Sequence, residues 1–169
     1  MNIFYLHKDP VTCAQYHCDK HTVKMILEYA QLLSTAHHFY KTRLASSGKI
    51  YKSTHVNHPS AIWARECRAN YGWLHELLVA LCKEYTYRYH KIHKVQASGL
   101  LKLLSNIPEE LPLNLKTTMP QAMPDHCKHK NSITAYHNYY AQEKERMLTF
   151  TGRRIPDFLK TYGYSEQII

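Results

Sequence analysis

The sequence predicts an all-α protein, and two observations support this prediction. No segment alternates apolar and polar residues with the period of two that a half-buried strand shows, whereas several segments repeat apolar residues at helical spacing. The clearest stripe runs from Leu74 to Tyr85. With 169 residues and 44% hydrophobic content, the chain has the size and the core-forming capacity of one domain. We therefore expect a single compact helical domain over residues 1–169, with a long N-terminal helix and a proline-rich loop.

The long N-terminal helix is predicted from its start signal and its periodicity. Asp9 can cap the helix, and Pro10 suits its first position. We expect the helix to run from Val11 to about His38 as one piece. Its first half is crowded with polar groups, and its second half carries apolar residues at helical spacing: Met25, Ile26, Tyr29, Leu32, Leu33 and Ala36.

The remaining elements follow from similar signals. After a basic loop over 41–57, Pro59 opens a second helix whose Ile62 and Trp63 are expected to point inward. Asn70 can cap a third helix, which ends in the basic and aromatic block 85–91. Further expectations are a short helix over 100–104, a loop over 108–124 with four prolines, a helix from Asn131 or Ser132 to about Met147, and a short tail element after Arg153.

Charge and composition indicate the kind of partner. The chain carries 22 Lys+Arg against 13 Asp+Glu, a net charge of +9, together with 14 tyrosines and 13 histidines. Cations bind phosphates, and tyrosine rings stack on bases, so DNA or a nucleotide is the expected partner. A basic surface that serves only solubility is the alternative.

Other classes are disfavoured. No apolar run approaches the length of a membrane helix, and the first residues lack the pattern of a signal peptide, so we expect no membrane partner. The five cysteines are odd in number and form no CxxC motif, which favours a reducing compartment over a disulfide framework. The expected location is the cytoplasm, that of the host cell if the protein is viral. No cofactor is expected, and the pattern does not indicate an oligomeric state.

The first candidate site is the polar half of the long helix. Asp19, Lys20, His21 and Lys24 place a carboxylate, an imidazole and two ammonium groups within about two helical turns, and His17 lies one turn before them. Such a density of titratable groups is typical of an active site or a phosphate site. An exposed helix face with charges that touch only water is the alternative.

A metal site in the same region is a further alternative. Spacing of four puts Cys13, His17 and His21 on one face of an unbroken helix, as a metal-dependent enzyme would require. A tetrahedral zinc site needs a fourth ligand, and no spacing in the chain is diagnostic of a known zinc module. The run His126–His129 is too short and isolated to indicate zinc. No metal is therefore assigned.

Two more segments are candidates for substrate binding. His55, Asn57 and His58 precede a helix N-terminus, where anions bind favourably, and Arg65 follows two turns later. We expect this segment to line one pocket with 19–24, His21 and His58 lying within reach of a single nucleotide.

The second segment is the basic and aromatic block. Tyr87 and Arg88 interleave a ring with a cation, as binding of single strands or flipped bases requires. A plain helix end is the alternative there. Tyr136 and Tyr140, on a shared face, are core residues or a ligand wall.

Several features together resemble a known family. They are the opening MNIFYLH, the polar stretch Gln15–Lys24, the triplet Asn57–Pro59, Tyr71 with Leu74, and the pair Tyr139–Tyr140. The ordering resembles that of the pyrimidine-dimer DNA glycosylases of the phage endonuclease V type, which are small, basic, all-α proteins.

The resemblance implies a mechanism. In that family an N-terminal α-amine attacks C1′ of the damaged nucleotide and forms an imine, a glutamate on the first helix assists, and β-elimination cuts the strand. Because Asn2 disfavours removal of the initiator residue, the amine here is that of Met1. The carboxylate position falls on Asp19 or His21. The resemblance thus implies Met1, Asp19 and His21 as catalytic residues.

The leading interpretation is a phage-like, DNA-binding protein that processes a base, as a DNA glycosylase/AP lyase acting on a damaged or modified base. A non-catalytic protein that sequesters a nucleotide or counters host defence is the second hypothesis. The metal-dependent enzyme is the third. The recognised base, the host and the oligomeric state are not indicated by the sequence.

Overall fold

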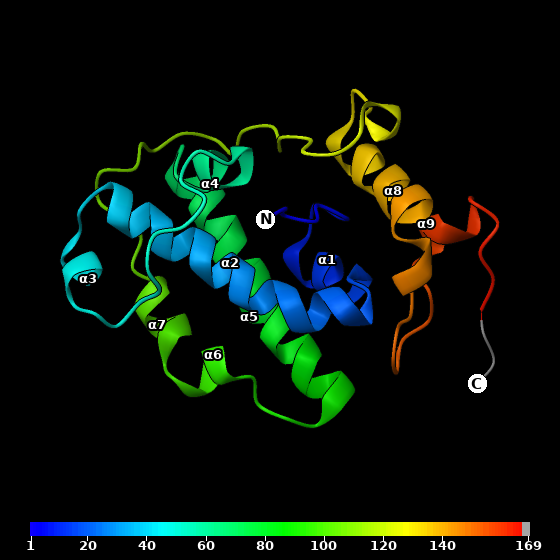
Figure 1. The fold of residues 1–169 in the computed structure, drawn as a ribbon, viewed down its shortest axis with the longest axis horizontal. Helices are drawn as coiled ribbons and strands as arrows, with labels where there is room; N and C mark the ends of the chain where they lie inside the picture. The colour runs from blue at the N-terminus through cyan, green and yellow to red at the C-terminus, as the bar shows by residue number, and fades with distance from the viewer. Residues whose placement is uncertain (167–169) are drawn as a thin grey trace.

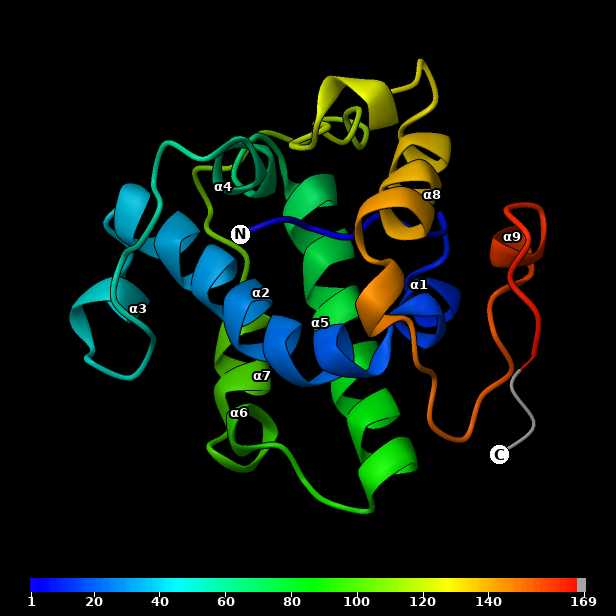
Figure 2. The same ribbon diagram turned by 45° about the vertical axis from the view of Figure 1, so that its right-hand side comes forward.

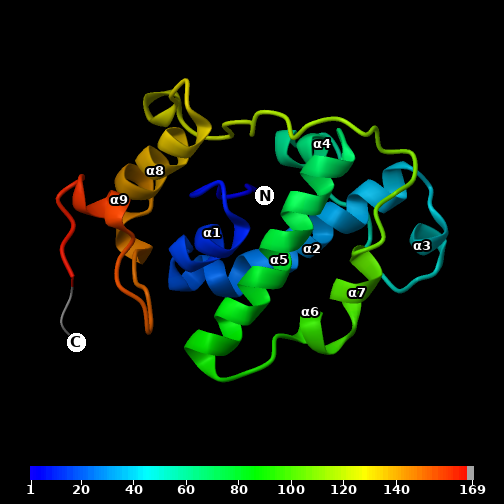
Figure 3. The same ribbon diagram turned by 180° about the vertical axis from the view of Figure 1, so that it is seen from behind.

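The computed structural model describes residues 1–166, and within them it is helical without strands, which confirms the all-α prediction. Two long helices form its centre. Helix α2 (Asp19–Phe39) crosses α5 (Arg68–Tyr89), and α1 (Pro10–Tyr16) packs on α5 as well. Seen from behind, α5 runs across the molecule in front of α2 (Figure 3).

Smaller elements surround this centre. They are α3 (Arg43–Ser46), α4 (Pro59–Ala64), α6 (Lys94–Ala97), α7 (Leu100–Leu104), the 3₁₀ turns η1 (Asp125–Cys127) and η2 (Glu145–Met147), α8 (Ser132–Glu143) and α9 (Asp157–Lys160). The proline-rich stretch has no helix and passes over α4 on its way from α7 to η1 and α8 (Figure 1).

The predicted helix starts are mostly correct. The Asp9 carboxylate accepts a hydrogen bond from Thr12 N at 2.9 Å, so it caps α1 as expected. His58 caps α4 through Nδ1, and Asn131 caps α8 through its side chain. Helix α5, however, begins at Arg68, and the Asn70 amide instead donates to Trp63 O. Trp63 is buried as predicted, but Ile62 is exposed.

The prediction of one continuous N-terminal helix is wrong. The chain leaves helical geometry at His17 and Cys18, both extended, before α2 starts at Asp19. Contacts from distant segments hold this break: Cys18 N donates to Tyr140 Oη at 3.2 Å, and Asp19 N donates to Thr149 O at 2.8 Å. The last long helix also ends earlier than expected, at Glu143, with a 3₁₀ turn after it.

The core extends from the N-terminal segment to α9. Ile3 and Leu6 are fully buried in it, although the segment before α1 has no regular structure. In both Figure 1 and Figure 2 the N-terminus lies in the middle of the molecule, among α2, α4 and α8. None of the helices within residues 1–166 is both long enough and apolar enough to cross a bilayer.

Candidate active site

The N-terminal segment is fixed by its own backbone and side-chain contacts. Phe4 N donates to the Tyr29 hydroxyl at 3.1 Å, and the Asn2 amide donates to Ala122 O at 2.9 Å. The Met1 side chain is 5% exposed. A tethered segment of this kind keeps the terminal amine in one place, whereas the amine of a frayed terminus would move freely.

The amine of Met1 lies at a cleft of about 210 Å³ between α2 and the end of α8. The Glu28 carboxylate is its nearest ionic partner, with Oε2 4.0 Å from the amine nitrogen, and Lys24 Nζ lies 3.6 Å from Oε1 of the same carboxylate. Three segments contribute to the lining, which consists of Met1, Asn2, Phe4, Lys20, His21, Lys24, Met25, Glu28, Tyr139, Lys144 and Met147.

The cleft has an excess of positive charge. Among the residues that the structure describes, Lys20, Lys24, Lys144 and the Met1 amine line it, against the single carboxylate of Glu28. Helical spacing explains the contribution of α2, because residues three or four apart lie on one face. A cationic cleft with one carboxylate beside an amine is suited to a phosphate-bearing ligand and to proton transfer.

His21 forms one wall of the cleft. Its ring stacks on Phe4 with 4.0 Å between ring centroids, and its Nδ1 lies 2.7 Å from the Tyr140 hydroxyl. Burial, reinforced by the neighbouring His17 and by the charges of Lys144, Lys24 and Lys20, lowers the pKa of His21 to about 3. The imidazole is therefore neutral at physiological pH and serves as a fixed wall and hydrogen-bonding group.

His58 caps the start of α4. Its Nδ1 accepts from Ser60 N at 3.1 Å, which leaves the proton of the neutral ring on Nε2. Burial lowers the pKa of His58, the positive charge of the Met1 amine lowers it further, and the charge of Glu28 opposes the shift. His58 does not line the cleft, however, and neither do His55, Asn57 and Arg65, so a single pocket shared with the 19–24 segment stays a prediction. His55 and Asn57 are exposed on the preceding turn.

Asp19 does not lie at this cleft. Its carboxylate accepts from Arg88 Nη1 at 3.0 Å and from the backbone and hydroxyl of Thr151 at 2.8 Å each. Burial raises the pKa of Asp19, but these hydrogen bonds outweigh burial and hold that pKa below its ordinary value. The assignment of Asp19 as the catalytic acid is therefore corrected: the carboxylate is committed to contacts within the fold.

Arg88 and His17 are also interior groups, and their assignment to substrate binding is corrected. The Arg88 side chain is fully buried and binds Glu84, Asp19 and Gln15 O. His17 is fully buried as well, with Nδ1 2.7 Å from Cys13 O and Nε2 2.7 Å from the Tyr29 hydroxyl. Because a carbonyl only accepts, Nδ1 is the donor, and Nε2 accepts from Tyr29.

The predicted metal set is not brought together. The thiol of Cys13 donates to Phe4 O, both ring nitrogens of His17 are occupied, and the helix break separates His17 from the face of His21. Within residues 1–166, these three do not form a group with converging ligand atoms.

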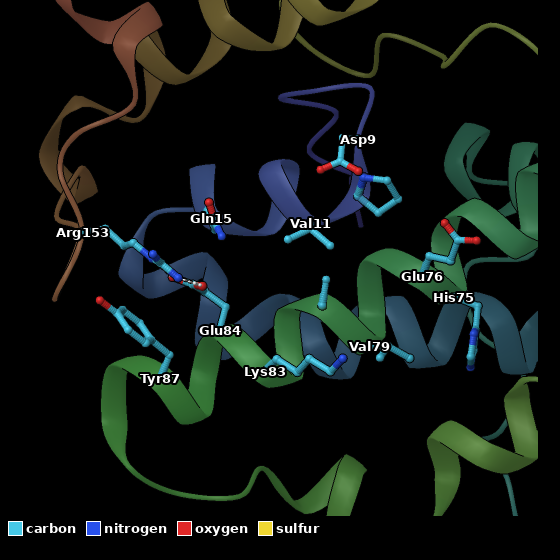
Figure 4. Close-up of a pocket in the computed structure, with 12 residues that line it drawn as sticks. Asp9, Val11, Gln15, His75, Glu76, Val79, Lys83, Glu84, Tyr87 and Arg153 are labelled. Carbon is cyan, nitrogen blue, oxygen red and sulfur yellow. Dashed lines mark hydrogen bonds and ion pairs between the residues drawn. The ribbon is translucent and has the colours of Figure 1, made fainter.

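Tyr87 and Arg65 lie elsewhere. Tyr87 borders a groove of about 630 Å³ between α1 and α5, where its hydroxyl donates to Gly152 O and Arg153 stacks over its ring (Figure 4). Arg65 is buried, donates to Val56 O at 2.7 Å and stacks on Phe39. It therefore supports the loop that carries His55 and Asn57 instead of reaching a substrate, and its assignment is corrected.

The sequence analysis missed Glu28 and Lys144, and it noted Tyr139 only as part of the family resemblance. Glu28 continues the face of Lys20 and Lys24 at helical spacing, so the pattern held a signal for it. Lys144 carried no such signal, because only the packing of α8 and the turn after it brings Lys144 and Tyr139 to the cleft. The ammonium of Lys144 lies 4.7 Å from the centre of the Tyr139 ring.

Comparison with known proteins identifies one family for this chain. No curated protein and no solved structure matches the chain. A family model described as pyrimidine dimer DNA glycosylase matches residues 1–97, more than half of the 169 residues. The match includes the N-terminal segment, α2 and α4, whereas Tyr139 and Lys144 lie outside it. The chain therefore belongs to the pyrimidine dimer DNA glycosylase family.

Proposed function

We propose that this protein is a DNA glycosylase with an accompanying lyase activity, acting on a pyrimidine dimer or another modified base. The α-amine of Met1 is the nucleophile, and Glu28 is the carboxylate that moves protons beside it. The ion pair between these two groups in a cationic cleft is the observation that supports the proposal. Family membership supports it independently.

The first step displaces the base. An α-amine is less basic than a lysine amine, so a larger share is unprotonated near neutrality. Glu28 accepts the proton that the ammonium of Met1 gives up, and the freed lone pair forms a bond to C1′. The N-glycosidic bond breaks, its electron pair leaves with the base, and the base takes up a proton.

The second step opens the sugar and cuts the strand. The nitrogen loses a proton, the C1′–O4′ bond breaks with O4′ taking up a proton, and an imine joins C1′ to the chain. Removal of a proton from C2′ then expels the 3′ phosphate by β-elimination. Glu28 is placed to accept protons in this step too, because it lies beside the nitrogen that carries the sugar.

Substrate recognition is assigned to the groups around the amine. Lys20, Lys24 and Lys144 would neutralise phosphates, and the Tyr139 ring would stack on a base. His58 would donate from Nε2. A cleft of about 210 Å³ falls below the roughly 300–1,000 Å³ of sites that enclose a drug-sized ligand, which suits one sugar or base with the duplex outside.

Borohydride trapping tests the proposal. Duplexes that contain a pyrimidine dimer or an abasic site are incubated with the protein and borohydride, and the adduct is digested and analysed by mass spectrometry. We expect the reduced sugar on the α-nitrogen of Met1. An adduct on the side chain of Lys20 or Lys24 would overturn the assignment of the nucleophile. Tight binding of a nucleotide without any adduct or strand cleavage would support the sequestering protein instead.

A matched variant separates the amine from its position. One glycine added before Met1 keeps a free terminal amine but moves it by one residue, about 3.3–3.6 Å of chain. We expect trapping to fall sharply while DNA binding persists, because the lysines are unchanged. Full trapping by the extended protein would contradict the role of the Met1–Glu28 geometry.

A further inference from the structure

A second cluster of reactive side chains lies at the C-terminal end of α8, where η1 packs against this helix. The imidazole of His126, the thiol of Cys127 and the carboxylate of Glu143 each offer one ligand atom, and these atoms all lie within 4.8 Å of one another. His126 Nε2 and Glu143 Oε1 are 2.6 Å apart. The cluster joins residues about 16 positions apart, so sequence spacing alone does not reveal it.

We propose that His126, Cys127 and Glu143 bind one Zn²⁺ ion through Nε2, Sγ and a carboxylate oxygen. The donor set carries the argument, because nitrogen, sulfur and oxygen together suit zinc. Magnesium and calcium take oxygen ligands almost exclusively.

The separations suit a tetrahedral ion after a small adjustment. Zinc–ligand bonds of about 2.0–2.3 Å place tetrahedral ligand atoms roughly 3.3–3.6 Å apart. His126 and Glu143 would open slightly from their hydrogen-bonded 2.6 Å, with the ion replacing the shared proton. Both side chains are partly exposed, 58% and 37%, so they can move and the ion can enter from solvent. Water takes the fourth position.

Cys127, the ligand with the least freedom to move, is held in place by the fold. Cys127 is buried, its carbonyl accepts from the Asn138 amide of α8 at 3.1 Å, and its N–H donates to Pro124 O at 3.0 Å. Within residues 1–166 its thiol has one weak partner, Gln142 Oε1 at 3.8 Å, so ligation displaces little. Deprotonation of the thiol on binding releases one proton to solvent.

The role of this ion is structural. It would link η1 to the last turn of α8, immediately before Lys144, whose side chain lines the cleft. The ion would thereby fix the position of the helix end that carries Lys144 to the cleft. It lies outside the part of the chain matched by the family model and does not depend on the glycosylase proposal.

The test uses the purified full chain and two metals. After chelation, one sample is reloaded with Zn²⁺, dialysed against metal-free buffer and measured for Zn²⁺ content by mass spectrometry, and a second metal-free sample is titrated with Co²⁺ as a spectroscopic probe. We expect one equivalent of metal and a sulfur-to-cobalt charge-transfer band. At a hundredfold excess over Kd, Zn²⁺ should raise Tm by about 5–10 °C. Failure of the wild-type protein to retain zinc or to develop the band would overturn the proposal.

Variants assign the ligands. Cys127→Ser should abolish the charge-transfer band, and Glu143→Gln should weaken metal affinity on the order of 100-fold, since removal of even an outer-shell partner costs 10- to 100-fold. Glu145→Gln makes the same change two residues on, at an exposed position, and should leave affinity unchanged. Equal losses in Glu143→Gln and Glu145→Gln would show a nonspecific charge effect and refute the site. Circular dichroism without metal checks that each variant folds.

Discussion

Two ionic clusters in this protein contain a buried or half-buried glutamate, and they differ in how tightly that glutamate is paired. Glu84 is nearly fully buried and receives Arg88 Nε and Arg153 Nε at 2.9 Å each. Glu28 lies at the cleft, 3.6 Å from Lys24 and 4.0 Å from the Met1 amine. The Glu84 cluster neutralises its charges internally, whereas the cleft leaves cations in excess. Loose pairing beside an opening keeps groups available for chemistry, and tight pairing in the interior serves the fold.

The largest expected effect is on catalysis by Glu28→Gln. General acid–base groups typically contribute 10²- to 10⁴-fold to the rate, so single-turnover cleavage of dimer-containing DNA should fall by about that factor. The free energy of unfolding should change by less than about 1 kcal/mol, because partly exposed ion pairs contribute little. A variant that cleaves normally would remove Glu28 from the mechanism, whatever its stability.

The same substitution at Glu84 should mainly lower the stability of the protein. Glu84→Gln leaves the interior charge of Arg88 and the charge of Arg153 without their shared partner, which should destabilise the protein by about 3–5 kcal/mol in urea unfolding. Asp157→Asn breaks the exposed pair with Lys160 and serves as a control that should stay within about 0.5 kcal/mol. If Glu84→Gln were as stable as this control, the contrast between the two clusters would fail.

The buried histidines should make stability depend on pH. Burial lowers the pKa of His17 to about 4, against 6.5 for an ordinary histidine. Between these values the unfolded chain binds a proton that native His17 does not, so the free energy of unfolding falls as pH falls from about 6.5 to about 4.

His21 acts in the same direction over a window that ends near pH 3. Each histidine contributes at most about 1.4 kcal/mol per pH unit. Urea midpoints measured at several pH values check this expectation, and His17→Gln should reduce the slope. A stability that stays constant from pH 6.5 to 4.5 would contradict it.

The smallest expected effect concerns the cations of the cleft. Lys20→Ala and Lys24→Ala should each lower the salt dependence of duplex binding by about 0.9 log unit per log unit of salt, if each contacts one phosphate. Lys160→Ala, on α9, is the matched control and should leave the slope unchanged. If the wild type and all three variants showed the same salt dependence of duplex binding, the DNA would bind on another face of the molecule.

Local signals in the sequence determined a large part of the fold. The stripe from Leu74 to Tyr85 fixes the inward face of α5, because a 3.6-residue period allows only one such face. Asp9 with Pro10 and His58 with Pro59 mark two helix starts, since capping depends on atoms within three residues. The grouping of Lys20, His21 and Lys24 follows from the same helical geometry.

Tertiary structure decided which charges form the site. Periodicity favoured an unbroken helix, but the hydroxyl of Tyr140 and the carbonyl of Thr149 bind the backbone at the break from more than a hundred residues away. Those contacts hold Asp19 away from the cleft, where its carboxylate binds Arg88. The Met1 amine meets Glu28 because Ile3 and Leu6 are buried in the core, which no local pattern specifies. Helical spacing relates residues three or four apart, and only the path of the whole chain relates residue 1 to residue 28.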